Sequence, residues 1–185
     1  MGKNRINPIV KLAQKRTTFG WIYLILAGIL GNGEKWMIFA GFIISLSGEF
    51  FRTMSAGTIK KNEVLAINGL YSLNRHPLYF GSFLMSLGIS IASNNIAVWL
   101  YFLILFPLIY IPTMFKEEKY LKTKFGNDYK YYKKTIPAFF PKIKKINSLN
   151  FSWKRFKYNK EQFNWIAIVI LYFILYSKKF FDFWF

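Results

Sequence analysis

Long apolar blocks alternate with short polar segments along the chain. The apolar blocks lie at residues 17–32, 36–51, 78–93, 96–115 and 163–176. A helix that crosses the hydrocarbon core of a bilayer needs about 20 residues, so several blocks predict tilted helices or a locally thinned bilayer. The last block predicts either a fifth crossing or a helix that lies flat at the interface. The pattern as a whole predicts an all-α fold, a polytopic membrane helix bundle with about five transmembrane helices.

The polar segments between these blocks differ strongly in charge. The chain carries a net charge of +18, although 54% of its residues are hydrophobic and 21% are aromatic. Lysine and arginine concentrate at 1–18, 52–76 and 116–161, whereas 31–35 and 93–95 are nearly neutral. By the positive-inside rule, the basic segments lie on the cytoplasmic side of the membrane. Because the lysines flank apolar blocks, we expect anionic membrane lipids as their partners and no binding of nucleic acid.

The composition excludes several kinds of chemistry. The chain has no cysteine, which excludes disulfides, thiolate metal sites and cysteine nucleophiles. It has a single histidine, His76, so we expect no metal site of the usual histidine-rich type. The sequence also lacks the alternation of strands and helices that would predict a Rossmann-type enzyme. Any activity is therefore expected to reside in a helical membrane protein.

The apolar blocks 78–93 and 96–115 are separated by one short polar turn. They are therefore predicted to form a tight antiparallel hairpin with both outer ends on the cytoplasmic side. Charged and polar residues lie at both outer ends of the hairpin: residues 75–77 come before the first block, and 117–118 come after the second. The hairpin would bring these two groups of residues to the same depth of the membrane.

The residues at the two ends of the hairpin have more than one interpretation. Pro77 suits the first turn of a helix, and Arg75 and His76 beside it are typical of a juxtamembrane cap. Glu117 and Glu118 lie in the most basic part of the chain, and Glu118 is spaced to pair with a lysine four residues on. Carboxylates here also suit a cofactor with cationic and hydroxyl groups, whose own carboxylate Arg or His would bind. The residues alone leave both interpretations open.

The order of the motifs is more informative than any one of them. The chain contains Arg75-His76-Pro77-x-Tyr79-x-Gly81, then an apolar span, then Glu117-Glu118-x-x-Leu121, then Phe125-Gly126 and the pair Tyr129 and Tyr132. Across residues 45–141, this order resembles the isoprenylcysteine carboxyl methyltransferase and phospholipid methyltransferase family. Enzymes of that family are integral membrane proteins that use S-adenosylmethionine.

The resemblance implies a cofactor and a domain organisation. We expect a cytosolic segment that binds S-adenosylmethionine at the ends of the hairpin. The implied cofactor-binding residues are His76, Pro77, Tyr79, Gly81, Glu117, Glu118, Leu121, Tyr129 and Tyr132. Residues 1–185 are expected to form a single membrane domain with a methyltransferase core at 45–141. A basic linker and a C-terminal hydrophobic helix at 142–185 would extend beyond the family pattern.

Glu49 and Arg52 near the end of the second apolar block are further candidates. Charged groups at membrane depth are functional candidates by default, although these two residues are also spaced to form a simple i,i+3 ion pair. If the methyl acceptor is a carboxylate, Arg52 or Arg75 would hold it by a bidentate contact. If the acceptor is an amine, Glu49 is a candidate base, because a proton must leave. The predicted catalytic residues are therefore Glu49, Arg52 and Arg75.

The predicted function is carboxyl O-methylation of an isoprenylcysteine-like or other lipidic carboxylate. The expected partners are a lipidic or prenylated small-molecule substrate and the membrane lipids. One alternative is a phospholipid N-methyltransferase. An alternative of another class is a non-enzymatic membrane protein that binds lipid or acts as a scaffold. We expect a multi-pass membrane protein whose active site faces the cytoplasm.

Overall fold

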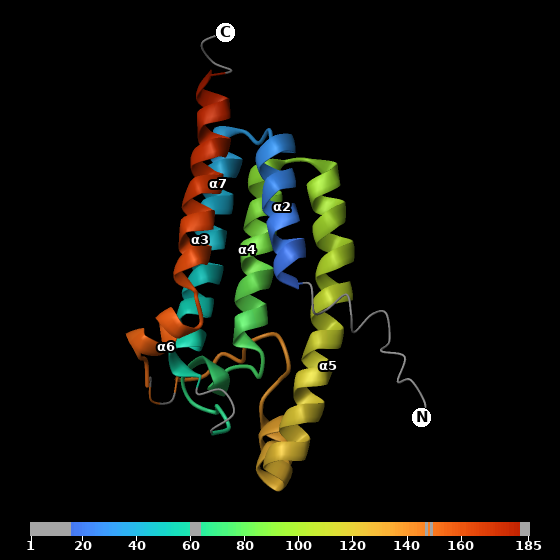
Figure 1. The fold of residues 1–185 in the computed structure, drawn as a ribbon, viewed down its shortest axis with the longest axis vertical. Helices are drawn as coiled ribbons and strands as arrows, with labels where there is room; N and C mark the ends of the chain where they lie inside the picture. The colour runs from blue at the N-terminus through green and yellow to red at the C-terminus, as the bar shows by residue number, and fades with distance from the viewer. Residues whose placement is uncertain (1–15, 60–63, 147, 149, 182–185) are drawn as a thin grey trace, which may run out of the picture.

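The chain folds as an elongated bundle of α-helices (Figure 1). This computed structural model describes residues 16–59, 64–146, 148 and 150–181. Its elements are α2 (Arg16–Leu30), α3 (Lys35–Thr58), η1 (Gly69–Ser72), α4 (Pro77–Ser93), α5 (Ile96–Thr135), α6 (Trp153–Tyr158) and α7 (Gln162–Phe181), of which η1 is a 3-10 helix. Helices α2, α3, α4, α5 and α7 run along the bundle, and α6 lies near its lower end (Figure 1). The prediction of an all-α fold is confirmed.

Three of the helices are long and apolar enough to cross a membrane, namely α3, α5 and α7. Helices α2 and α4 are also apolar but contain 15 and 17 described residues. At 1.5 Å per residue they are about 22 and 25 Å long, whereas a bilayer core is about 30 Å thick. The five predicted apolar blocks therefore all become helices of one bundle, three of full spanning length and two shorter.

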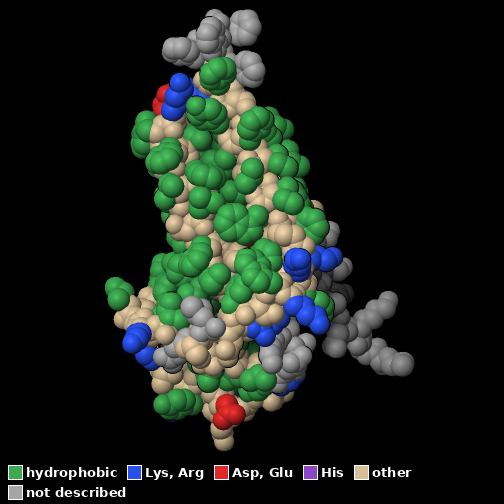
Figure 2. Space-filling model, turned by 90° about the vertical axis from the view of Figure 1, so that its left-hand side faces the viewer, with side chains coloured by type: hydrophobic (Ala, Val, Ile, Leu, Met, Phe, Trp, Pro, Cys, Tyr) green, Lys and Arg blue, Asp and Glu red, His purple; other side chains and the backbone are tan. Residues whose placement is uncertain are grey.

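The outer surface of the bundle is apolar. Side chains such as Ile25, Phe39 and Phe173 are 57%, 68% and 70% exposed. Figure 2 shows hydrophobic side chains over most of the long flank, with Lys and Arg side chains gathered mainly toward the lower end. Continuous apolar surface of this kind is unfavourable in water and suits contact with acyl chains.

Helix α7 packs lengthwise in the bundle and does not lie flat across its end (Figure 1). Leu171 and Leu175 are buried on its inner face. Near its end, the ammonium group of Lys178 donates hydrogen bonds of 2.8 Å to the carbonyl oxygens of both Ile29 and Gly31. Carbonyl groups at the end of a helix lack partners within the helix, so Lys178 caps α2. The C-terminal hydrophobic helix is thus part of the bundle.

Helices α3 and α4 approach closely because small residues line their contact. A Cβ atom added to Gly48 would lie 2.5 Å from the carbonyl oxygen of Gly81, and one added to Gly88 would lie 2.4 Å from that of Gly41. Both distances are too short for a side chain, so glycine allows the two backbones to touch. This contact places Arg52 of α3 directly beside α4.

The predicted hairpin of α4 and α5 is confirmed, and asparagines form its turn. Asn94 adopts the left-handed conformation (φ 43°, ψ 40°), which asparagine tolerates better than most residues. Asn95 is the N-cap of α5, and its side-chain oxygen accepts a hydrogen bond of 2.9 Å from the backbone N–H of Ala97. The chain therefore reverses within a few residues, and the outer ends of both helices lie at the same end of the bundle.

Helix α5 contains a second reversal at Gly126. The backbone of Gly126 has φ 54° and ψ −117°, a conformation that is strained for residues with a side chain. In an unbroken helix, residues 118 and 133 would be about 22 Å apart. Instead, the Lys133 ammonium lies 2.7 Å from a carboxylate oxygen of Glu118. The segment after Gly126 therefore folds back against the cytoplasmic end predicted for the bundle.

Candidate functional site

The first polar cluster forms where α4 begins and the apolar part of α5 has ended. His76 is the residue before α4, and its Nε2 lies 3.4 Å from Glu118 Oε1 while its Nδ1 lies 3.6 Å from Glu117 Oε2. His76 and Glu118 are buried, whereas the side chain of Glu117 is 50% exposed. The predicted convergence of these three side chains is confirmed. We call these three residues, together with Arg75 and Lys133, which pair with Glu118, and Tyr129 close by, the His76 cluster.

Glu118 is fully engaged within this cluster. Its Oε1 lies 2.6 Å from Nη2 of Arg75, and its Oε2 lies 2.7 Å from the ammonium of Lys133. Arg75 also donates a hydrogen bond of 2.8 Å to the carbonyl oxygen of Lys133. Glu118 thus ties together the start of α4, the body of α5 and the segment after Gly126. Glu117 makes a long contact with His76 and lies near the hydroxyl of Tyr79, and half of its side chain stays exposed.

Backbone contacts fix His76 and Arg75 from the other side. The backbone N–H of Arg75 donates to the carbonyl oxygen of Pro137 (2.9 Å), and that of His76 donates to Ala138 (3.1 Å). These amides precede α4 and lack partners in the helix, so the returning segment satisfies them. The reversal at Gly126 is what delivers this segment. The position of His76 therefore depends on the fold of α5 as well as on α4.

The charges in the cluster stabilise one another. Burial would lower the pKa of His76, but hydrogen bonds to Glu117 and Glu118 outweigh burial and raise it above its ordinary value. The hydrogen bond from His76 is the largest cause that lowers the pKa of Glu118 to about 2, against burial and with help from Lys133 and Arg75. Both residues lie outside the apolar part of their helices. The cluster therefore favours the charged form of each partner.

The remaining predicted residues take several positions. The ring of Tyr79 stacks on His76, with ring centres 5.6 Å apart at 21°. Tyr132 is buried and donates a hydrogen bond of 2.7 Å to the carbonyl oxygen of Tyr71, outside the cluster. Pro77 is the first residue of α4, and Leu121 lies partly buried one turn beyond Glu117 and Glu118. Gly81 faces α3, where an added Cβ would lie 2.5 Å from the carbonyl oxygen of Gly48, so helix packing accounts for glycine there.

Two buried donors of the His76 cluster have no hydrogen-bond partner among the described residues. They are Nε of Arg75 and the Tyr129 hydroxyl, which lies near Glu118 without the geometry of a hydrogen bond. Buried polar atoms are almost always paired, so such donors mark places where a ligand or water completes the site. S-adenosylmethionine has a carboxylate and ring nitrogens that accept hydrogen bonds, and an ammonium and hydroxyls that suit Glu117. The residues present therefore fit this cofactor.

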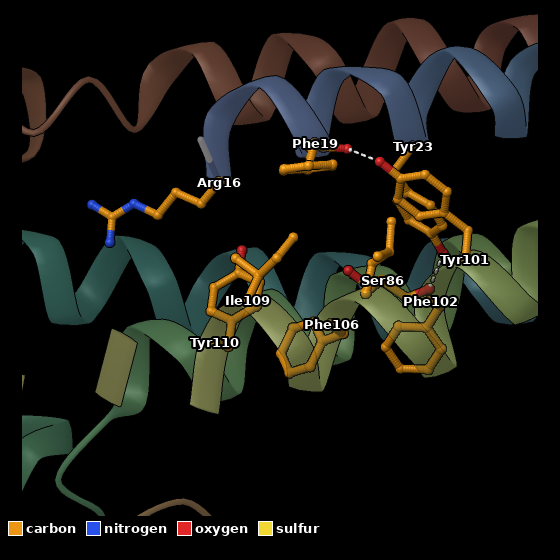
Figure 3. A pocket seen from close by; sticks show the side chains of 11 residues that line it. Arg16, Phe19, Tyr23, Ser86, Tyr101, Phe102, Phe106, Ile109 and Tyr110 are labelled. Atoms are coloured by element: carbon orange, nitrogen blue, oxygen red, sulfur yellow. Dashed lines mark hydrogen bonds between the residues drawn. The ribbon is translucent and has the colours of Figure 1, made fainter. Parts of the chain in front are cut away.

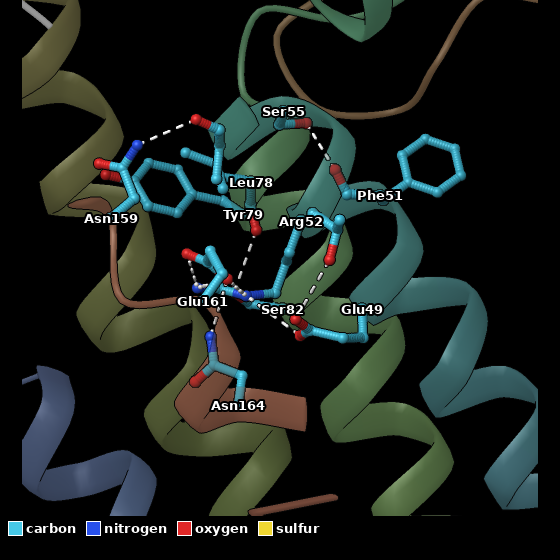
Figure 4. A network of polar contacts seen from close by, with 12 residues as sticks. Glu49, Phe51, Arg52, Ser55, Leu78, Tyr79, Ser82, Asn159, Glu161 and Asn164 are labelled. Carbon is cyan, nitrogen blue, oxygen red and sulfur yellow. Dashed lines mark hydrogen bonds and ion pairs between the residues drawn. The ribbon is translucent and has the colours of Figure 1, made fainter. Parts of the chain in front are cut away.

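A second polar cluster lies between α3, α4 and α7 (Figure 4). Arg52 contacts Glu161 with Nη2 at 2.8 Å from Oε1 and Nε at 3.1 Å from Oε2, and its Nη1 donates to the hydroxyl of Ser82. Asn164 donates a further hydrogen bond of 2.8 Å to Glu161. Glu49 lies 3.7 Å from Arg52, so the i,i+3 pair predicted from the sequence is present but is the weaker contact. We call this group the Arg52 cluster.

Glu161 was not among the residues predicted from the sequence. It is the only acidic residue between Asp128 and Asp182, at the junction of a basic linker and an apolar helix. That isolation was the available signal, but an acid at a helix start also has an ordinary explanation in the helix dipole. Its pairing with Arg52 depends on α7 returning to α3, which no local pattern reveals.

An apolar groove lies between α2, α4 and α5 (Figure 3). Counted together with the open solvent at its mouth, the groove measures about 350 Å³. Its lining comprises Arg16, Phe19, Gly20, Tyr23, Ser86, Tyr101, Phe102, Leu105, Phe106, Ile109 and Tyr110. Tyr23 and Tyr101 stack with ring centres 5.5 Å apart toward one end. Arg16 extends from the start of α2 at the other end (Figure 3). The groove thus has one cationic end and one aromatic end.

Comparisons with known proteins agree with the motifs. The model of the phospholipid methyltransferase family matches residues 23–128. The protein-S-isoprenylcysteine O-methyltransferase of Schizosaccharomyces pombe is 31% identical over 97 residues, which cover 52% of this chain and 41% of that protein. The enzyme of the same name from Dictyostelium discoideum is 29% identical over 143 residues, covering 66% of this chain and 56% of that protein.

A third relative carries a different kind of name. The cobalt-zinc-cadmium resistance protein CzcN of Cupriavidus metallidurans is 36% identical over 84 residues, covering 45% of this chain and 38% of that protein. The chain therefore spans about half the length, or less, of the curated relatives it matches. No solved structure matched the chain.

The family match covers more than half of the 185 residues and includes most of the His76 cluster. The long apolar helices and the membrane family together make the chain a multi-pass membrane protein. Membership of a methyltransferase family also implies the use of S-adenosylmethionine. By its sequence, its helical architecture and its motifs, the chain belongs to the phospholipid methyltransferase family.

Proposed function

We propose that the protein is an S-adenosylmethionine-dependent methyltransferase that methylates the carboxyl group of a lipidic, isoprenylcysteine-like acceptor. The observation that carries this proposal is the His76 cluster. It combines a half-exposed carboxylate with buried donors that have no partner among the residues the structure describes, at the residues that resemble the family motifs. The names of two relatives, both protein-S-isoprenylcysteine O-methyltransferases, support a carboxylate acceptor.

In this proposal, the residues of the His76 cluster bind the cofactor. Glu117 accepts hydrogen bonds from its hydroxyls or its ammonium, and Arg75 and Tyr129 donate to its acceptor atoms. Glu118 keeps its partners and positions Arg75 and His76. When bound, S-adenosylmethionine supplies a methyl group already activated by the sulfonium. The protein's own contribution is orientation and the exclusion of water.

The proposal includes the arrangement in the membrane. Helices α2, α3, α4, α5 and α7 all cross the bilayer, and the shorter α2 and α4 are accommodated by local thinning or by snorkelling of flanking side chains. The His76 cluster then lies at the cytoplasmic face, because the basic segment 116–134 lies at the same end of the bundle. A soluble cofactor reaches the site from the cytoplasm, and a lipidic acceptor reaches it from the bilayer.

Phospholipid N-methylation is the second candidate function. It is favoured by Glu49, a fully buried carboxylate whose Oε2 has no hydrogen-bond partner among the described residues. An amine acceptor must lose a proton, whereas a carboxylate acceptor loses none and needs no base. Treating labelled product with alkali separates the two functions, because methyl esters release methanol and methylamines do not.

Binding of S-adenosylhomocysteine, the demethylated cofactor, tests the proposal without requiring turnover. Calorimetric titration in detergent should show binding by the native protein and at least tenfold weaker binding by His76→Ala, since hydrogen bonds to charged groups contribute about 1.5–3 kcal/mol. Lys130→Ala is the matched control, because Lys130 is exposed on the segment after Gly126. A non-enzymatic lipid-binding protein would show no binding at all, which would overturn the proposal. Equal affinity of native protein and His76→Ala would overturn the assignment of the site.

A further inference from the structure

Two of the arginines near the proposed site are already engaged. Glu161 and Ser82 bind the guanidinium of Arg52. Arg75 is held by Glu118 and by two backbone carbonyl oxygens. A bidentate contact with an acceptor carboxylate would require either side chain to give up these partners. The sequence-based prediction that Arg52 or Arg75 holds the acceptor therefore has a competitor in the protein's own contacts.

Arg16 is placed differently. Its side chain is exposed, and among the described residues its guanidinium donates one hydrogen bond, of 3.3 Å, to the hydroxyl of Tyr79. Tyr79 in turn stacks on His76. The other donor groups of Arg16 have no partner within the described part of the chain, and Arg16 lies one residue away from the His76 cluster.

The groove next to Arg16 is suited to a hydrocarbon chain. Phe19, Phe106 and Ile109 are among its lining side chains. Tyr23 is seven positions after Arg16, about 10 Å along α2. An amphiphile with its head at Arg16 would therefore place the first part of its chain against aromatic and aliphatic side chains. The charge of the one end and the apolar character of the rest complement a molecule with an anionic head and an apolar tail.

We infer that Arg16 anchors the carboxylate of the methyl acceptor, while the adjoining hydrocarbon chain lies in the groove between α2 and α5. The inference rests on the proposed function and names the residue that selects an anionic acceptor over a neutral one. A guanidinium offers two parallel donors to a carboxylate, a contact that an alcohol or an uncharged ester does not reproduce. Through Tyr79, the anchored head group is held beside the residues proposed to bind the cofactor.

The first test compares an acid with a matched alcohol. Palmitate and hexadecanol are titrated into protein in nanodiscs of neutral lipid, with native protein, Arg16→Gln and the control Lys130→Ala. The expected result is a rise of about tenfold or more in the Kd for palmitate in Arg16→Gln, about 1.4 kcal/mol. The Kd for hexadecanol should be unchanged in all three proteins. An unchanged Kd for palmitate in Arg16→Gln would overturn the inference.

The second test fills the groove. Gly20 lines the groove, and a Cβ atom added there meets nothing within 4 Å, so Gly20→Leu is the substitution chosen to occupy the open space. It should weaken binding of both probes and leave the melting temperature unchanged or higher, because leucine is the better helix former. A palmitate with a photoreactive group on its chain should cross-link to α2 and α5 in native protein. Cross-links confined to other helices would overturn the inference.

Binding of S-adenosylhomocysteine separates this inference from the proposed function. Arg16→Gln should bind S-adenosylhomocysteine as the native protein does, because Arg16 is not among the proposed cofactor-binding residues. If native protein binds palmitate through Arg16 but does not bind S-adenosylhomocysteine, the methyltransferase proposal fails and the anionic-lipid site stands. If S-adenosylhomocysteine binds and the loss of Arg16 leaves palmitate affinity intact, the anchor fails and the methyltransferase proposal stands.

Discussion

The two polar clusters are built from the same kinds of groups but differ in how completely they are paired. In the Arg52 cluster, the guanidinium is bound by Glu161, whose remaining capacity is taken by Asn164. In the His76 cluster, Glu118 is equally saturated, but Glu117 beside it is half exposed. The Arg52 cluster therefore joins helices, whereas the His76 cluster joins segments and still presents groups to a ligand.

The clusters also differ in the segments that supply them. The Arg52 cluster links α3, α4 and α7 within the bundle (Figure 4). The His76 cluster links the residues before α4, the end of the apolar part of α5 and the segment that returns after Gly126. Groups at the end of a bundle are accessible to a soluble cofactor, whereas groups packed between its helices are not. We expect substitutions in the Arg52 cluster to affect stability and those at Glu117 to affect ligand affinity.

The largest expected effect is on the stability of the Arg52→Ala variant. Removing one partner of a buried ion pair leaves an uncompensated charge and costs about 3–5 kcal/mol. In a chain of this size that lowers the melting temperature by about 6–20 °C. The double variant Arg52→Leu with Glu161→Leu should recover much of the loss, because it removes both charges. A fall of less than 2 °C in detergent would show that the pair does not hold α7 against α3.

Glu117→Gln should have the opposite profile. The affinity for S-adenosylhomocysteine should fall about tenfold, since a charged acceptor is replaced by a neutral one, while the melting temperature changes little. The contrast with Arg52→Ala is the test of the comparison between the clusters. If Glu117→Gln destabilises the protein as strongly as Arg52→Ala, then Glu117 is a structural group and the distinction between the clusters is wrong.

The pairing of His76 with Glu118 should make stability depend on pH. Because the folded-state pKa of His76 is raised, its contribution is fully present below the unfolded value of about 6.5 and is lost as pH rises through the folded value. Because the pKa of Glu118 is lowered to about 2, its contribution is present above about 4.3 and is lost as pH falls through 2. The difference in melting temperature between native protein and His76→Gln should therefore be greatest near pH 5–6. A difference that grows above pH 8 would contradict the pairing.

The sequence predicts the helices and the hairpin well because their causes are local. Apolar blocks of helical length and a turn containing Asn94 and Asn95 are sufficient to place His76 near Glu117 and Glu118. The same hairpin predicts that the polar residues at its two ends lie at the same end of the bundle. Their roles in binding a cofactor stay predictions, since they rest on the resemblance and on chemistry.

The contacts that could not be predicted are those that join distant elements. Glu161 reaches Arg52 across 109 positions, through a helix whose place in the bundle no periodicity specifies. Arg16 likewise reaches Tyr79 only because α2 packs beside α4 and α5. Arg52 was predicted to hold an acceptor because of its charge, but Glu161 already neutralises that charge. Sequence patterns identify charged groups, but only the fold shows which of them remain available.

The smallest effect is expected for Gly126→Ala, a substitution at the reversal in α5. This reversal supports the His76 cluster but not the Arg52 cluster. Gly126→Ala adds no steric contact within 4 Å, so its only cost is the positive φ, about 1 kcal/mol. Gly20→Ala is the matched control, because Gly20 is helical and also has open space, so alanine there should be neutral or slightly stabilising. Gly126→Ala should lower the melting temperature by about 2–4 °C. It should also weaken the binding of S-adenosylhomocysteine, because the segment that holds Arg75 and His76 shifts. Since the Arg52 cluster does not depend on this reversal, hydrogen exchange in α7 should be the same in both variants, and faster exchange there in Gly126→Ala would mean that the two clusters are coupled.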